Sequence, residues 1–157
     1  YTMPLPEKDE MYLTKGKMLQ DIVVCLGGRI AESLVFDDVT TGAVQDIRQA
    51  TERARDMVTK YGFSDELGMI NYSTSDDEVF IGREIGHAKN FSEGTAAVID
   101  QEVKRIIESC REKATKILKE NRKVLDKLAE LLIEKERIGQ QEFEALFEQN
   151  DETIEEM

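Results

Sequence analysis

The residues best placed to do chemistry lie between Thr40 and Thr51, where an acid stands at the start of a helical pattern. A hydroxyl of Thr40 or Thr41 is suited to cap the helix, and Gly42 loosens the turn before it. Apolar side chains then recur at helical spacing and predict one buried face: Ile47, Ala50, Ala54, Met57, Val58 and Tyr61. Asp46 stands beside this face, so we expect its carboxylate to point toward the interior.

Two acids in this region have ordinary interpretations as well as chemical ones. Carboxylates near helix N-termini stabilise the helix dipole by about 0.3–1 kcal/mol, and residue types alone favour that role for Asp46. Glu32 follows Gly28 by four positions and is either an exposed acid or a polar neighbour of the Asp46 site. The ordinary interpretation is favoured for Glu32 too.

Cysteine and histidine usage limits the other chemistries. Cys25 and Cys110 are far apart in sequence and lie among apolar neighbours, which indicates two buried, reduced thiols rather than a disulfide or redox pair. His87 is the single histidine, and no Cys-x-x-Cys pair is present. A metal site made by this chain alone is therefore nearly excluded. We interpret His87, between Gly86 and Ala88, as a surface or capping residue.

The element before Asp46 is expected to be a helix capped by Thr14. Its predicted core face comprises Met18, Leu19, Ile22, Val23, Leu26, Ile30 and Leu34. Gly27 and Gly28 inside this pattern would cost about 2 kcal/mol relative to two alanines, which suggests close packing of another backbone or a local kink. Lys60 and Gly62 indicate the end of the Asp46 helix. Residues 69–72 and 79–81 could be two short strands or ordered loop.

The last third of the sequence predicts three further helices. Ser92 is suited to cap a long one, with a face of Val98, Ile99, Val103, Ile106, Ile107, Cys110, Ala114, Ile117 and Leu118. Asn121 is expected to break this helix and cap the next, and a loop at residues 137–139 leads to a third. The short connections predict a compact helical hairpin with an added helix, which looks like scaffold or subunit interface.

Composition favours a soluble, mainly α protein. The 157 residues are 40% hydrophobic and 34% charged, with two prolines. A net charge of −12 argues against nucleic-acid binding, which needs a basic surface. No apolar run reaches the roughly 20 residues of a membrane-spanning helix. The opening residues look like the end of a strand, so we expect the sequence to begin inside a domain.

Several collinear blocks resemble the peptidase domain of FtsH, the membrane-anchored ATP-dependent zinc metalloprotease. They are residues 1–6 (Tyr-Thr-Met-Pro-Leu-Pro), 27–32 (Gly-Gly-Arg-Ile-Ala-Glu), 40–43 (Thr-Thr-Gly-Ala) with Asp46, 57–58 with 61–64, 79–83 and 99–103. The resemblance covers nearly the whole chain. It implies a helical, bundle-like peptidase-domain fragment with at most two short strands, at 69–72 and 79–81. Residues 1–91 would form the peptidase-core part and residues 92–157 a C-terminal helical subdomain of the same domain.

The resemblance also implies a zinc site. In this family two histidines of a His-Glu-x-x-His helix and an aspartate from another helix bind zinc, and the glutamate of that motif activates water. The match to the Thr-Gly-Ala-x-x-Asp block makes Asp46 the third zinc ligand. Glu32 would be an accessory acid close by. Val44 stands where the family often has a smaller polar residue, which affects local packing only.

The His-Glu-x-x-His segment is absent from this sequence and is expected upstream, together with the ATP-binding domain and the membrane segments. The chain would then hold one of three ligands and no catalytic base. We therefore expect the isolated chain to be soluble, to retain no stoichiometric zinc and to cleave no protein, because zinc sites need three or four protein ligands. The complete protein would be a homo-hexamer at the cytoplasmic face of a membrane.

Two functions of different classes remain open at this point. The first is part of a zinc endopeptidase that uses ATP to degrade unfolded and membrane proteins in protein quality control. The second is a non-catalytic helical scaffold or oligomerisation module. The resemblance favours the first for the complete protein, and the incomplete ligand set favours the second for the isolated piece.

Overall fold

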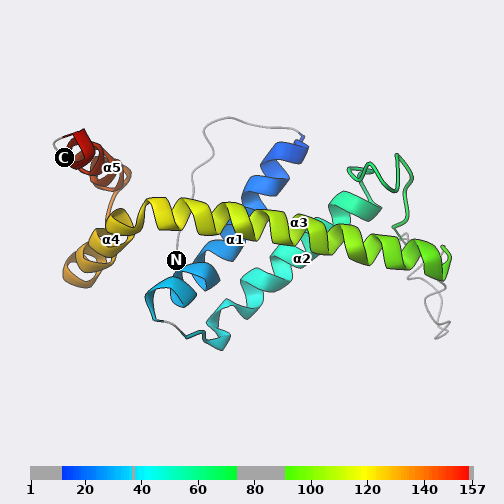
Figure 1. The fold of residues 1–157 in the computed structure, drawn as a ribbon, viewed down its shortest axis with the longest axis horizontal. Helices are drawn as coiled ribbons and strands as arrows, with labels where there is room; N and C mark the ends of the chain where they lie inside the picture. The colour runs from blue at the N-terminus through cyan, green and yellow to red at the C-terminus, as the bar shows by residue number, and fades with distance from the viewer. Residues whose placement is uncertain (1–11, 37, 74–90, 156–157) are drawn as a thin grey trace.

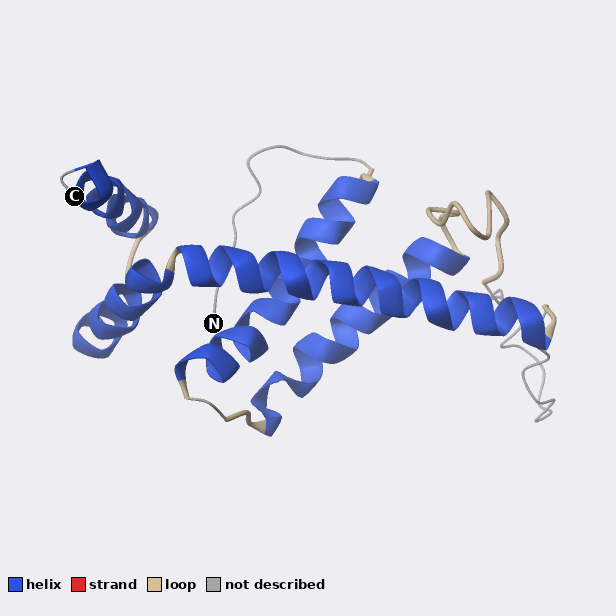
Figure 2. Cartoon of the chain, viewed as in Figure 1, coloured by secondary structure: helices blue, strands red, loops and turns tan. Residues whose placement is uncertain are grey.

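The computed structural model describes residues 12–36, 38–73 and 91–155. Its elements are α1 (Lys15–Val35), the 3-10 turn η1 (Thr41–Ala43), α2 (Val44–Thr59), α3 (Glu93–Glu120), α4 (Arg122–Lys135) and α5 (Gln140–Glu155). The described residues form helices and loops without a strand, which confirms the mainly α prediction (Figure 2). Residues 69–72 are loop, and residues 79–81 and His87 lie outside the described ranges.

Helices α1, α2 and α3 pack against one another and form the body of the structure (Figure 1). The loop after α1 reverses the chain, and α3 then crosses both earlier helices. Because α3 packs on residues from the first half of the chain, its apolar face completes the core that α1 and α2 begin. The division into residues 1–91 and 92–157 stays a prediction.

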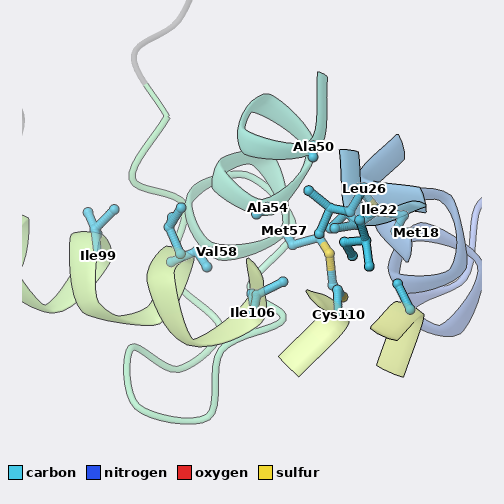
Figure 3. Packing of buried hydrophobic residues seen from close by; sticks show 13 residues of the cluster. Met18, Ile22, Leu26, Ala50, Ala54, Met57, Val58, Ile99, Ile106 and Cys110 are labelled. Carbon is cyan, nitrogen blue, oxygen red and sulfur yellow. The ribbon is translucent and has the colours of Figure 1, made fainter. Parts of the chain in front are cut away.

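The core lies where the three helices meet (Figure 3). Its buried members are Met18, Ile22, Leu26, Ile30, Ala50, Ala54, Met57, Val58, Ile99, Val103, Ile106, Cys110 and Ala114. Every residue of the predicted α1 face is buried or packs against this cluster. Two residues of the predicted α2 face do not: Ile47 is 42% exposed and Tyr61 is 46% exposed. They lie at the first turn of α2 and just beyond its last residue, where fewer helices cover the surface.

Helix caps confirm two predictions and correct two others. The Thr14 side chain accepts a hydrogen bond from the Lys17 amide, and the Ser92 side chain accepts one from the Thr95 amide. Thr40 caps η1 rather than α2, whose own N-cap residue makes no side-chain hydrogen bond. The Asn121 amide group donates to the Ile117 carbonyl at 2.9 Å. Asn121 therefore satisfies the end of α3 and gives α4 no side-chain cap.

The two C-terminal helices form a pair of their own. Helix α4 packs mainly against α5, so the hairpin joins α4 to α5 rather than α3 to α4. Lys135 donates to Glu142 across the connecting loop at 2.6 Å. Arg122, the first residue of α4, donates to the Leu34 carbonyl of α1 at 2.8 Å and pairs with Asp126. This contact attaches the start of the pair to the end of α1.

Two general features follow from the helices. None of those described is both long and apolar enough to cross a lipid bilayer. A Cβ added at Gly27 or Gly28 would meet no described atom within 4 Å, so the described residues give no sign of a second backbone packed against this pair.

Candidate metal-ligand site at the start of helix α2

Asp46 lies in the first turn of α2 and is exposed to solvent. The expectation that its carboxylate points toward the interior is therefore wrong. The reason is visible in Figure 1, where α2 begins away from α3 and only its later turns pass under that helix. Ala43 and Ala50 are buried, whereas the residues between them, Asp46 included, are exposed.

Although exposed, Asp46 influences the electrostatics of Cys25 on α1. Burial raises the pKa of the Cys25 thiol, Arg53 opposes the shift, and the carboxylates of Asp46 and Asp21 add to it. Arg53 is also paired with Asp21 of α1. The Arg53–Asp21 pair therefore links α2 to α1, and the charge of Asp46 acts on Cys25 of α1.

Glu32 lies in the last turn of α1 and contacts the segment that leads to Asp46. Glu32 Oε1 accepts a hydrogen bond from the Thr40 hydroxyl at 2.9 Å, and Glu32 Oε2 accepts one from the Thr40 amide at 3.2 Å. Arg29 Nη1 donates to the Thr40 carbonyl at 2.8 Å and lies 3.8 Å from Glu32 Oε2. The contacts of Glu32 are thus with Thr40 and Arg29, and its role as a neighbour of the Asp46 site stays a prediction.

Gly42 allows this turn to close tightly. Its amide donates to the Thr40 hydroxyl oxygen at 3.1 Å. A Cβ at position 42 would lie only 3.2 Å from that same oxygen and 4.0 Å from Glu32 Oε1. Glycine is therefore suited to this position because a side chain would crowd the hydroxyl on which the turn depends.

Zinc prefers nitrogen, sulfur and carboxylate-oxygen donors, usually three or more from the protein. Asp46 is a suitable oxygen donor with an accessible carboxylate. Within residues 12–36, 38–73 and 91–155, however, no group of three His, Cys, Asp or Glu side chains is arranged to hold a metal ion. The described residues therefore fit one zinc ligand and do not make a complete zinc site.

The two cysteines do not complete such a site. Both are free: Cys110 is buried, as the sequence predicted, whereas Cys25 is only half-buried. Burial raises the pKa of each thiol, which keeps it protonated and unreactive. Cys110 Sγ donates to the Leu19 carbonyl at 3.7 Å, so its role is in packing between α3 and α1.

A charged cluster around the buried Glu102 of α3 was not predicted from the sequence. Glu102 is only 8% exposed and accepts a 2.6 Å hydrogen bond from the Ser64 hydroxyl. Arg105 donates to both oxygens of Glu102, at 2.7 and 2.8 Å. These Arg105 hydrogen bonds, helped by Ser64 and opposed by burial, lower the pKa of Glu102 to about 2. The available signal was an acid inside the apolar pattern of Ile99, Val103 and Ile106.

The cluster anchors the loop that follows α2. Ser64 also accepts a hydrogen bond from the Leu67 amide at 3.3 Å, and Gly62 and Gly68 adopt positive φ angles of 62° and 70°. A cleft of about 360 Å³ lies here, lined by Lys15, Gly62, Phe63, Ser64, Asp65, Gly68 and Met69. Asp46 and Glu32 do not line it, so this loop and the candidate ligand are separate features.

Comparison with known proteins agrees with the resemblance seen in the sequence. The model of peptidase family M41 matches residues 1–146. An ATP-dependent zinc metalloprotease FtsH 1 from Thermoanaerobacter sp. (strain X514) is 51% identical over 151 residues, covering 96% of this chain and 25% of the relative. The FtsH protein of Caldicellulosiruptor bescii is 52% identical over 146 residues, covering 93% of this chain and 24% of the relative.

A third relative, the ATP-dependent zinc metalloprotease FtsH of Thermotoga maritima, is 43% identical over 154 residues, which is 98% of this chain and 25% of that protein. The chain thus spans about a quarter of the length of these relatives. The family match covers Asp46, Glu32 and the Thr40–Gly42 turn, as well as the three helices that form the core. By this match, the chain belongs to peptidase family M41.

Proposed function

We propose that this chain is part of an ATP-dependent zinc endopeptidase that degrades unfolded and membrane proteins. The observation that carries the proposal is the match to peptidase family M41 across residues 1–146, which includes the block with Asp46. Relatives that carry the name ATP-dependent zinc metalloprotease share 43–52% of the aligned residues. ATP and the membrane anchor belong, in this proposal, to other parts of the complete protein, which acts at the cytoplasmic face of a membrane.

Within that protein Asp46 is the third zinc ligand. The placement of this acid on an exposed helix start supports the role, because ligands from another segment can then approach the same carboxylate. Its position on a helix that is packed against α1 and α3 also restricts its movement. The two histidines and the catalytic glutamate come from a His-Glu-x-x-His segment that this sequence does not contain.

The test uses the complete protease with the substitution Asp46→Ala. We expect loss of bound zinc, measured by atomic absorption, and loss of casein hydrolysis. Glu52→Gln is the matched control, because Glu52 is an exposed acid on the same helix that pairs only with Arg48 among the contacts seen. Hydrolysis that survives Asp46→Ala would remove Asp46 from the ligand set.

A second function is supported by a separate observation. The pair α4 and α5 exposes large apolar side chains: Leu132 is 41% exposed, Ile133 84%, Phe143 41% and Phe147 37%. Such a surface is suited to subunit contact, and we propose that it contributes to a homo-hexamer. As the alternative, the isolated chain is a non-catalytic scaffold or oligomerisation module.

Light scattering of the isolated chain in a chelating buffer separates the alternatives. A larger assembly without metal would favour oligomerisation as the activity of this piece. A zinc assay on the same material after dialysis provides the second measurement, for which we expect less than one zinc per chain because one carboxylate is too weak a site. One retained zinc per chain would contradict that expectation.

A further inference from the structure

We infer that Glu32 is a positioning residue that fixes Asp46 through Thr40, and that it does not itself bind the metal. The inference rests on the proposed function, because it concerns how the ligand at position 46 is held. The sequence resemblance placed Glu32 near the site but gave it no specific role. Hydrogen bonds between α1 and the turn before α2 support this role.

Both oxygens of Glu32 are already engaged. One accepts from the Thr40 hydroxyl at 2.9 Å and the other from the Thr40 amide at 3.2 Å. These two hydrogen bonds direct both oxygens of the carboxylate toward Thr40. The Glu32 side chain is 28% exposed, so its contacts are partly shielded from water.

Arg29 also contacts Thr40. Its guanidinium donates to the Thr40 carbonyl at 2.8 Å, so α1 holds both the amide and the carbonyl of Thr40. Arg29 and Glu32 are three positions apart on α1 and therefore lie on one side of that helix. Thr40 is thus fixed relative to a helix whose apolar face is buried in the core.

A short segment connects Thr40 to Asp46. The Thr40 hydroxyl accepts from the Gly42 amide at 3.1 Å and caps η1, which runs directly into α2. Ala43 between them is buried, and α2 has no side-chain cap of its own. The direction in which α2 starts, and with it the place of Asp46, therefore depends on the pairing of Thr40 with Glu32.

The experiment measures zinc affinity of the complete protease by competition with a chromophoric chelator. The central pair of variants is Thr40→Val, which removes the hydroxyl at nearly constant volume, and Thr40→Ser, which retains it. We expect Thr40→Val and Glu32→Ala to weaken zinc binding by about 10- to 100-fold, the usual effect of losing a group that orients a ligand. Thr40→Ser should restore affinity to within about threefold of wild type.

Glu108→Gln serves as the matched control, because Glu108 also pairs with an arginine three positions away but lies on α3, far along the chain from the turn. It should leave zinc affinity unchanged. Thermal unfolding of each variant checks folding, and if Glu32→Ala does not fold, the two Thr40 variants still decide the question.

Two results would overturn the inference. Wild-type zinc affinity in Thr40→Val would show that the hydroxyl positions nothing, and weaker binding in Glu32→Ala alone would show that Glu32 does not act through that hydroxyl. Asp46→Ala is measured alongside. If Asp46→Ala loses zinc while Thr40→Val keeps it, only the positioning role fails; if Asp46→Ala keeps zinc, the proposed ligand and the inference fail together.

Discussion

Replacing Glu102 by glutamine should change both the stability of the fold and its dependence on pH. The carboxylate of Glu102 accepts hydrogen bonds from Ser64 at 2.6 Å and from Arg105 at 2.7 and 2.8 Å. These bonds favour the charged form and lower the pKa from 4.5 to about 2. The glutamine side chain keeps the shape but loses the charge that Arg105 pairs with.

The size of the effect can be worked out from that pKa. At 1.36 kcal/mol per pKa unit, the change from 4.5 to about 2 corresponds to roughly 3 kcal/mol of stabilisation at neutral pH. The Arg105 side chain is 63% exposed, so solvent screens its interaction with Glu102. We therefore expect Glu102→Gln to lower the free energy of unfolding by about 1–2 kcal/mol at pH 7.

The sign of the pH dependence follows from the lowered pKa. Stabilisation by Glu102 is complete above the unfolded-state pKa of about 4.5 and is lost as the pH falls toward the folded-state value of about 2. The difference between wild type and Glu102→Gln should thus shrink by about half between pH 7 and pH 3.

Urea unfolding followed by circular dichroism at both pH values measures this difference. Glu108→Gln is the control, since Glu108 and Arg111 form an exposed pair that should contribute less than about 0.5 kcal/mol. An equal difference at pH 7 and pH 3, or a Glu102→Gln variant as stable as wild type at pH 7, would refute the reasoning.

Three further predictions concern packing, backbone and thiols. Met57→Ala removes a side chain that is 0% exposed, and should lower the free energy of unfolding by about 2–5 kcal/mol in a urea titration. Gly62→Ala should lower the free energy of unfolding by about 1–2 kcal/mol, because φ is 62° and a Cβ would lie 3.1 Å from the Met69 backbone. Gly27→Ala, at a helical position with open space around it, should instead raise the free energy of unfolding by about 0.5–1 kcal/mol in the same assay. With a thiol reagent such as DTNB, Cys25 should react slowly in the folded protein and Cys110 only after unfolding, so that two thiols per chain react in denaturant. Fast reaction of both thiols in the folded protein would contradict their burial.

Local signals in the sequence predicted most of the helical framework. Thr14 and Ser92 are hydroxyl residues ahead of long apolar repeats, and both cap the helices they were expected to cap. The faces of α1 and α3 were predictable because each repeat is regular over several turns. Two positions of the predicted α3 face were misjudged: Val98 and Ile117 do not join the core cluster, and Ile117 is 43% exposed. The reduced state of the cysteines followed from their apolar neighbours in the same way.

Features that depend on neighbouring elements could not be predicted in this manner. Ile47 has the spacing of a core residue, yet it is exposed because the first turn of α2 extends away from α3. The same geometry leaves Asp46 open to solvent, contrary to expectation. Asn121 has the right type for an N-cap, but its amide reaches back to Ile117.

At the candidate site, too, some features could be predicted from the sequence and others could not. The resemblance of the sequence to a family selected Asp46, and residue types alone favoured an ordinary helix-dipole role for it. The pairing of Glu32 with Thr40 spans eight positions across a loop, and that of Ser64 with Glu102 spans 38. Such pairs depend on how helices come together, which no local periodicity specifies.

The last turn of α1 has a mechanical consequence for the molecule. The carbonyl of Leu34 receives Arg122 from α4, while Glu32, two positions earlier, holds Thr40 ahead of α2. The last turn of α1 therefore contacts both the C-terminal pair α4 and α5 and the segment that leads to Asp46. A force applied to α4 and α5 therefore reaches the same turn of α1 whose Glu32 side chain holds Thr40.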